Sequence, residues 1–194
     1  MAGVAQWVLD SAGVDDSGPT PMAALCAKRL GSPPRWISGL PMEAKLEGKV
    51  VLLRAGVPAT RARWLVGHEL AHDALNEVGY REPDVEDVAD AVGAALVAPS
   101  RAVRLAIAAA GGHRVYAIAD AFATTQSLAL LRIGEVTGRP VLLTRKGAPI
   151  ARGGAFVWGS ERKISEAVRG LVREVHPLRI RDEPHKVGLM AREW

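Results

Sequence analysis

The sequence predicts an α+β fold that is mainly helical and carries a small β-sheet. Long stretches of the first 138 residues repeat apolar side chains at helical spacing, and between them lies a short apolar run bounded by glycines, as in a strand. Hydrophobic residues make up 48% of the 194-residue chain and charged residues 24%, which is a globular composition. Aromatic residues make up only 5%, so alanine and valine must fill much of the core.

The N-terminal region is expected to begin loosely and then to form a helix. Residues 1–18 show no pattern that we assign to a regular element. From Thr20 to Gly31, apolar residues recur at helical spacing. Thr20 is expected to cap this helix, Pro21 suits its first turn, and Gly31 can end it.

A connection and a strand are expected next. Residues 32–41 contain three prolines and a glycine, which predicts a turn-rich connection. Within residues 45–56 we expect a turn followed by a strand, because residues 50–53 form an apolar run between glycines.

Two longer helices follow the strand. The first is predicted from Thr60 to about Val78, with Gly79 as its stop, and Gly67 within it indicates close packing on a neighbour. The second is opened by Pro83 and Asp84 and closed by Pro99, with Asp84 and Asp87 in the places of a capping box. Its apolar stripe has a period of about 3.6 residues and consists of Val85, Val88, Ala89, Val92, Leu96 and Val97.

The last part of the chain is expected to hold a helix pair and a small α/β segment. Residues 113–138 predict two short helices that are split near residues 124–126. A domain boundary is predicted near residues 139–140, which gives a first domain over 1–139 and a second segment over 140–194. The second segment is expected to be strand-like runs, a helix over 160–175, and a short strand with a tail.

The charges are unevenly distributed. Residues 61–100 carry eight acidic and three basic side chains, whereas residues 101–194 carry sixteen basic and eight acidic ones, within a net charge of +4. The local negative surplus suits a cation site. The basic part could face nucleic acid or an acidic protein, but blocks of like charge are absent, which favours a solvated arginine-rich surface.

Cysteine usage and hydropathy indicate the compartment. Cys26 is the only cysteine, so a disulfide framework within the chain and a cysteine-rich zinc finger are excluded. The N-terminus lacks the basic region of a signal peptide, and no window approaches the roughly 18–20 apolar residues of a membrane span. We therefore expect a cytoplasmic protein with no membrane partner. The sequence does not indicate an oligomeric state.

A His-Glu-Leu-Ala-His segment lies inside the first long helix. His68 and His72 are four residues apart, so they share one helix face and can bind one metal ion. Glu69 is rotated by about 100° from His68 and can reach a water without ligating the metal. The pattern predicts a catalytic Zn²⁺ site with Glu69 as the general base. The alternative is a pair of partly exposed histidines on an amphipathic helix.

A third protein ligand is expected from the next helix. Glu86 and Asp90 also lie four residues apart and share a face. Glu86 is the predicted ligand, and Asp90 is predicted to accept a hydrogen bond from the outer nitrogen of a ligating histidine. Asp73, directly after His72, could support a ligand in the same way, with a solvated carboxylate as the alternative.

These residues resemble the signature of the ImmA/IrrE metallopeptidase family. That family shows a His-Glu-x-x-His helix, then Glu-x-x-Ala-Asn/Asp, a Phe-Ala-Ala segment and a Leu-Leu-Met-Pro ending. Aligned on Pro99, this chain has Glu86 at the family's third zinc ligand, with residues 92–94 and 96–98 replacing the last two segments by Val-Gly-Ala and Leu-Val-Ala. The resemblance covers roughly residues 20–138, and residues 140–194 lie outside it.

The resemblance implies a zincin-like core with His68, His72 and Glu86 as Zn²⁺ ligands and Glu69 as the base. It implies a zinc-dependent endopeptidase of narrow specificity that cleaves a regulatory protein, with a helix-turn-helix repressor as partner, in a phage or mobile-element system. The alternatives are a zinc-containing binding module that does not cleave its partner, and a DNA-linked regulator.

Peptide hydrolysis also needs a group that stabilises the oxyanion. Tyr80 is the first candidate, and His113 and Tyr116 are two others, although each side chain is also compatible with a structural role. Asn76 could offer its amide to a substrate.

A DNA-reading helix-turn-helix is one interpretation of the helix pair over residues 117–136. Gln126, Ser127 and Arg132 would then face bases. The turn lacks the usual glycine and the second helix is mostly Leu, Ala and Ile, so a structural helix pair is favoured. Trp36, Trp64 and Trp158 are expected in the core or along a groove rather than stacked on nucleic acid.

Overall fold

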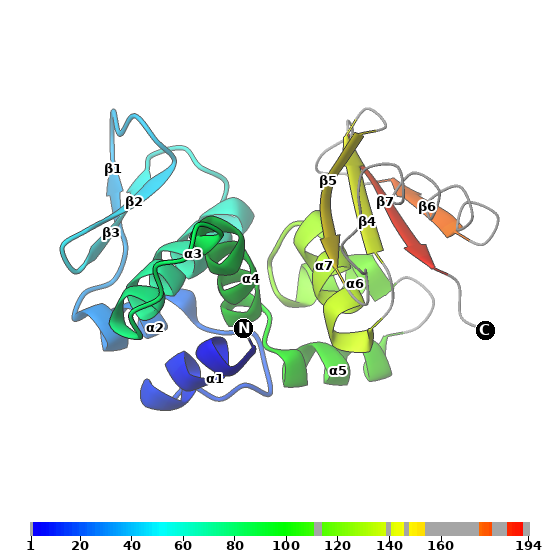
Figure 1. Cartoon of the computed structure of the whole chain (residues 1–194), viewed down its shortest axis with the longest axis horizontal. Helices are drawn as coiled ribbons and strands as arrows, with labels where there is room; N and C mark the ends of the chain where they lie inside the picture. Colours follow the sequence, from blue (N-terminus) through cyan, green and yellow to red (C-terminus); the bar gives the residue numbers. More distant parts are fainter. Residues whose placement is uncertain are drawn as a thin grey trace.

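The computed structural model describes residues 2–110, 114–138, 141–145, 148–153, 175–179 and 186–191 (Figure 1). It is a mixed α+β structure, mostly helical, with a small three-stranded sheet, as the composition and periodicity predicted. The helices are α1 (Ala2–Ser11), α2 (Met22–Leu30), α3 (Ala59–Glu77), α4 (Val85–Val97), α5 (Ser100–Ala109), α6 (Arg114–Ala121) and α7 (Gln126–Thr137). The strands are β1 (Arg35–Ile37), β2 (Ala44–Glu47), β3 (Val50–Arg54), β4 (Val141–Arg145), β5 (Ala148–Gly153), β6 (Val175–Arg179) and β7 (Lys186–Ala191).

The N-terminal region is more ordered than the sequence analysis predicted. Residues 1–18 were expected to be loose, but α1 forms there and buries Ala5, Val8 and Leu9 against the core. Their spacing of three and four residues is the helical signal that the prediction missed. The helix α2 was predicted well at its Gly31 end, but Thr20 does not cap it: Pro21 is the N-cap, and the hydroxyl of Thr20 is buried without a hydrogen bond.

The three-stranded sheet has the order β1-β3-β2, with β1 parallel and β2 antiparallel to β3. The predicted strand over residues 50–53 is confirmed as β3, in which Val51 and Leu53 are buried. The expected turn before it is wrong in part, because residues 44–47 form β2. The connection over residues 32–41 contains β1, whose exposed residues carry no alternating pattern and are held by pairing with β3.

Helices α3 and α4 are the two long helices that the sequence predicted, and they lie side by side (Figure 1). Gly79 ends α3 in the left-handed region, with φ +74°, and the amide of Tyr80 donates to the carbonyl of Leu75. The capping box expected at the start of α4 does not form. Asp84 is the N-cap, but its carboxylate accepts a hydrogen bond from the Tyr80 hydroxyl and not from the backbone of α4.

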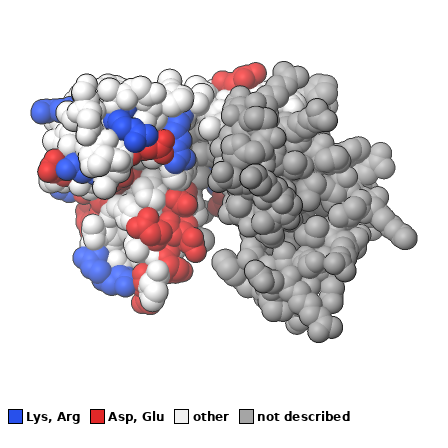
Figure 2. All heavy atoms as spheres, turned by 90° about the horizontal axis from the view of Figure 1, so that it is seen from above, with Lys and Arg blue, Asp and Glu red and all other residues white. Residues whose placement is uncertain are grey.

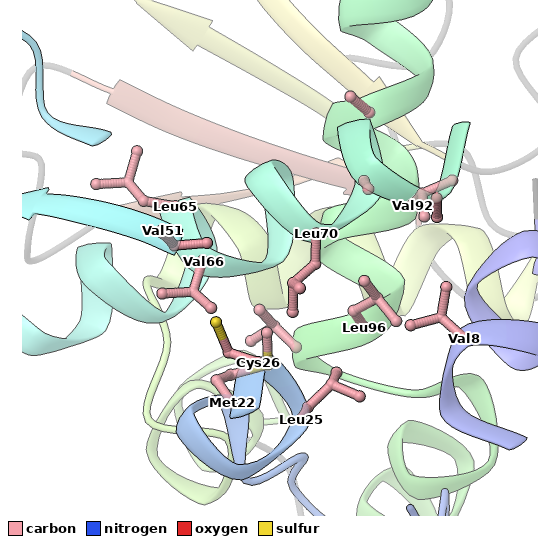
Figure 3. Packing of buried hydrophobic residues seen from close by; sticks show 14 of the residues in the cluster. Val8, Met22, Leu25, Cys26, Val51, Leu65, Val66, Leu70, Val92 and Leu96 are labelled. Carbon is pink, nitrogen blue, oxygen red and sulfur yellow. The ribbon is translucent and has the colours of Figure 1, made fainter. Parts of the chain in front are cut away.

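Among the described residues, nearly all buried hydrophobic side chains fall into two clusters. The larger one joins the three-stranded sheet and the helices α1 to α4. Figure 3 shows part of it, with Leu70 of α3 facing Leu25 and Cys26 of α2, and Leu96 of α4 nearby. Burial raises the pKa of the Cys26 thiol to about 11, so this cysteine behaves as a core residue. The second cluster begins at Ala98 and joins α5, α6 and α7.

The helix pair over residues 113–138 is confirmed as α6 and α7, and the hydroxyl of Thr125 caps α7 by accepting from the amide of Leu128. The helix α5, which begins directly after Pro99, was not predicted as a separate element. In the described part of the chain, no single helix could cross a membrane by length and composition, and only α4 with α5, bent by 54°, passes that test as a pair.

A second, four-stranded sheet has the order β5-β4-β7-β6, with every neighbouring pair antiparallel. The helix α7 packs against it. The strand-like runs expected after residue 140 are present as β4 and β5, and the short strand expected before the tail is present as β6. The tail itself supplies a further strand, β7. The helix predicted over residues 160–175 and the boundary at residues 139–140 lie outside the described residues, apart from Val175, where β6 begins.

Candidate metal centre

Two histidines on one face of α3 form the base of the site. His68 and His72 are both partly buried, and their Nε2 atoms lie 3.1 Å apart. Their rings meet edge to face with centroids 4.6 Å apart. The spacing of four residues on a regular helix therefore brings the two nitrogens to one point, as the sequence predicted.

Glu86 enters this point from α4. Its Oε2 atom lies 3.5 Å from Nε2 of His68 and 3.4 Å from Nε2 of His72. These three residues form a group that could hold a metal ion, and it is the one such group of His, Cys, Asp and Glu found among the described residues. The side chain of Glu86 is 72% exposed, so the group opens to solvent on the α4 side.

The separations of the three ligand atoms fit a tetrahedral ion. Zinc binds nitrogen and oxygen ligands at about 2.0–2.2 Å, which places two ligands of a tetrahedron about 3.3–3.5 Å apart. The observed separations of 3.1, 3.5 and 3.4 Å lie close to that value on all three edges. Two imidazoles and one carboxylate are also the donor types that zinc accepts.

Asp90 holds His68 from behind. Its Oδ1 atom lies 2.8 Å from Nδ1 of His68, on the side of the ring opposite to the Nε2 that faces His72 and Glu86. A proton on Nδ1 donates to this carboxylate and leaves Nε2 free as a ligand. The predicted partnership between Asp90 and a ligating histidine is thus present in the geometry.

The acidic neighbours change the protonation of His68. Burial lowers the pKa of this imidazole, but the hydrogen bond with Asp90 and the charges of Asp90, Glu69 and Glu86 raise it by more, so the net shift is upward. The carboxylates around His68 therefore favour a positive charge on this imidazole.

Glu69 stands beside the group without belonging to it. Its side chain is partly buried and has no hydrogen bond or ion pair with any other described residue. Its charge nevertheless acts on His68. This placement is compatible with the predicted role of Glu69 as a general base.

An aromatic and cationic wall that the sequence analysis did not anticipate lies one turn before His68. The ring of Trp64 is 5.3 Å from that of His68, and the guanidinium of Arg61 lies 4.3 Å from the Trp64 ring centre. Glu43, just before β2, accepts two hydrogen bonds from Arg61. The spacing of three and four residues between Arg61, Trp64 and His68 was the available signal.

Two predicted supporting residues have other partners. Asp73 was expected to support a histidine, but it is buried, with Oδ1 2.6 Å from Nζ of Lys49 and Oδ2 3.0 Å from Nε of Arg29. The second contact is an ion pair without hydrogen-bond geometry. The structure thus assigns Asp73 to packing between α2, α3 and the β2–β3 turn, because its two carboxylate oxygens lie against Arg29 and Lys49.

Tyr80, the candidate for stabilising the oxyanion, donates its hydroxyl to Oδ1 of Asp84 at 2.6 Å. This hydrogen bond, with desolvation and the charges of Asp84 and Glu82, raises the pKa of Tyr80 to about 12. Tyr80 lies beyond the end of α3 at Glu77, and its hydroxyl is engaged by Asp84 at the start of α4. The amide oxygen of Asn76 accepts from Arg81. Neither side chain belongs to the group of three, and His113 lies outside the described residues.

Acidic side chains are concentrated around the start of α4. Figure 2 shows Asp and Glu gathered on one side of the described part. Five acidic residues are exposed there, namely Glu82, Asp84, Glu86, Asp87 and Asp90. The predicted negative surplus of residues 61–100 is therefore concentrated beside the candidate ligands, where it favours a bound cation.

The helix pair α6–α7 does not present the residues that would read DNA. Gln126, Ser127 and Arg132 are all buried. Arg132 donates to the carbonyl of Ala98 and to the hydroxyl of Ser100, and it pairs with Glu135. These bonds tie α7 to the α4–α5 junction, so the structural interpretation of the pair holds and the base-reading one is wrong for these three residues.

Comparison with known proteins gives a likeness of fold alone. The sequence matches no known family model and no curated protein. A solved structure, described as a Mycobacterium tuberculosis transcriptional regulator, is similar with a TM-score of 0.59 and 12% identity, over 98% of this chain and 86% of that one.

Proposed function

We propose that the protein is a zinc-dependent endopeptidase with a zincin-like core, related to the ImmA/IrrE metallopeptidases. The observation that carries the proposal is the convergence of His68, His72 and Glu86 with tetrahedral separations, and with Glu69 left outside the group. Three protein ligands are typical of a catalytic zinc site, whereas a structural zinc site is closed by four.

The chain's own residues would divide the reaction between them. His68, His72 and Glu86 would hold the ion, and Asp90 would keep Nε2 of His68 turned toward it. The ion would supply Lewis acidity toward the scissile carbonyl and lower the pKa of a nearby water. Glu69 would accept the proton of that water and pass it to the leaving amine. The family resemblance implies that the enzyme has narrow specificity and that its substrate is a regulatory protein of repressor type.

The proposal can be tested without knowing the substrate. Wild type and Glu69→Gln, loaded to the same zinc content, are incubated with a proteome-derived peptide mixture, and new N-termini are identified by mass spectrometry. We expect cleavage by wild type and a loss of about 10²–10⁴-fold in rate in the variant, because removing a general base costs that much. Equal cleavage by both proteins would show that Glu69 is not the base.

A second candidate is a regulatory protein that binds zinc and docks a partner without cleaving it. The similar fold of the protein described as a transcriptional regulator favours this alternative. Zinc-loaded wild type that produces no new N-termini, in the peptide mixture or with a co-expressed repressor-type partner, would support it over the peptidase.

A further inference from the structure

We infer that Gly67 and Gly93 are positioning residues whose contact sets how closely α3 and α4 approach, and thereby sets the separation of the metal ligands. The inference rests on the proposed metal site, because it concerns how that site is assembled. His68 and His72 lie on α3 and Glu86 lies on α4, so the ligand set is only as well defined as the spacing of the two helices.

The two helices touch through backbone at these glycines. A Cβ atom on Gly67 would lie 2.7 Å from the carbonyl oxygen of Gly93, and a Cβ atom on Gly93 would lie 2.8 Å from the amide nitrogen of His68. The atoms in the way belong to helix backbone, which cannot turn aside as a side chain can. An alanine at either position must therefore push one helix away from the other.

Backbone conformation does not explain these glycines. Both lie inside helices, and neither has the positive φ that favours glycine. Glycine within a helix is less stable than alanine because it loses more conformational freedom on folding. The close approach of α3 and α4 is the feature that requires the missing side chains.

The contact is coupled directly to the ligands. Gly67 precedes His68 in the chain, and the clash at position 93 is with the backbone of His68 itself. Glu86, Asp90 and Gly93 are spaced by four and three residues, so they share one face of α4. A displacement of α4 at Gly93 is therefore carried to Asp90, one turn away, and to Glu86, two turns away.

The size of the displacement exceeds what a metal site tolerates. An ordinary contact begins at 3.4 Å, so relieving a contact of 2.8 Å needs a shift of about 0.6 Å. Metal–ligand distances are held within about 0.2 Å. We expect Gly93→Ala to raise the Kd for Zn²⁺ about 10–100-fold, the range seen when groups that orient ligands are removed.

The test measures zinc affinity with a chelator competition and coordination geometry by the visible absorption of bound Co²⁺, on the full chain. Gly93→Ala is the main variant, and Gly67→Ala serves if that one does not fold. Gly3→Ala is the matched control, since Gly3 lies in α1 with no atom within 4 Å of an added Cβ. Val97→Ala is the packing control, because it removes a side chain at the same crossing without forcing the helices apart.

We expect weaker zinc binding and an altered Co²⁺ spectrum in the glycine variants, and neither change in Gly3→Ala or Val97→Ala. Unchanged zinc affinity in both glycine variants would overturn the inference, and so would an equal loss in Val97→Ala at equal unfolding free energy. If wild type bound no zinc, the proposed metal site would be disproved together with this inference. If wild type bound zinc but cleaved no peptides, only the proposed peptidase activity would be disproved.

Discussion

Nδ1 of His68 and Oδ1 of Asp90 lie 2.8 Å apart, and this contact joins α3 to α4 beside the three candidate metal ligands. Its direction matters, because a hydrogen bond at Nδ1 leaves Nε2 as the nitrogen that faces His72 and Glu86. The pair therefore fixes the ring of His68 and places a negative charge behind it.

Replacing Asp90 with asparagine keeps the shape of the side chain and removes its charge. In metal-free protein we expect the pKa of His68 to fall, because Asp90 supplies the hydrogen bond and the first of the charges that raise it. We also expect zinc affinity to fall about 10–100-fold. Histidine ring NMR over a pH series measures the first effect and chelator competition the second. An unchanged pKa of His68 in Asp90→Asn would contradict the assignment.

Zinc binding should depend on pH through the same imidazole. The pKa of His68 lies above its usual value of 6.5, so a proton competes with zinc for Nε2 at a higher pH than for an ordinary histidine. Affinity is expected to fall as the pH drops through that raised pKa, and to fall at lower pH in Asp90→Asn. Isothermal titrations of both proteins with Zn²⁺ between pH 5.5 and 8 would show that the pH at which zinc affinity falls is lower in Asp90→Asn than in wild type.

The metal-free protein should show the opposite trend in stability. A raised pKa in the folded state means that the protonated form of His68 favours folding. This contribution is complete below the unfolded-state pKa, about 6.5, and is lost as the pH rises through the higher folded-state pKa. Urea unfolding is measured over a pH series with a chelator present, in wild type and in Asp90→Asn. The difference between the two plots of unfolding free energy against pH gives the contribution of His68.

Asp73 should contribute to stability and not to metal binding. Its side chain and that of Arg29 are each 8% exposed, so Asp73→Asn leaves a buried guanidinium whose remaining described partners are the more exposed Glu77 and the ring of Trp7. We expect a loss on the order of 3 kcal/mol in the free energy of unfolding, with zinc affinity unchanged. Lys49→Ala is the control, because Lys49 is 64% exposed and its removal should cost less than about 1 kcal/mol. Weaker zinc binding by folded Asp73→Asn would restore the predicted supporting role.

Ala123, in the turn between α6 and α7, has a φ of +45°, a region that costs a residue with a Cβ atom about 1–2 kcal/mol. Ala123→Gly removes that cost but adds freedom to the unfolded chain, so we expect a net gain of about 0.5–1 kcal/mol in the free energy of unfolding. Urea denaturation measures it. A loss of stability would mean that the turn is not strained.

The features of the fold and of the candidate site that could be predicted from the sequence are those that depend on neighbouring residues in the chain. His68 and His72 share a face because helix geometry requires it, and Gly79 ends α3 because glycine accepts a positive φ. Glu86 and Asp90 were predicted from spacing on their own helix, and both lie close to His68 because α4 runs back along α3. The cap expected from Asp84 failed because a tertiary partner, Tyr80, takes its carboxylate.

The parts that escaped prediction depend on contacts between distant segments. The strand β1 has no apolar pattern and exists through its pairing with β3. The direction of Asp73 follows from Arg29 and Lys49, which lie 44 and 24 residues away in sequence. Trp64 precedes His68 by four residues, so helix geometry places the two rings on the same face of α3. This spacing is known only for a tryptophan in the same helix as the histidines, and it gives no information about Trp36.

The measurement that tests the account most directly is the zinc content of purified protein by mass spectrometry. It compares wild type with His72→Ala and Glu86→Ala, and takes Asp87→Ala as control because Asp87 is the exposed acidic neighbour of Glu86. We predict about one zinc per chain in wild type and in Asp87→Ala, and its loss in the other two variants. Wild type without zinc after reconstitution, or Glu86→Ala that binds zinc as tightly as wild type, would contradict the three-ligand site.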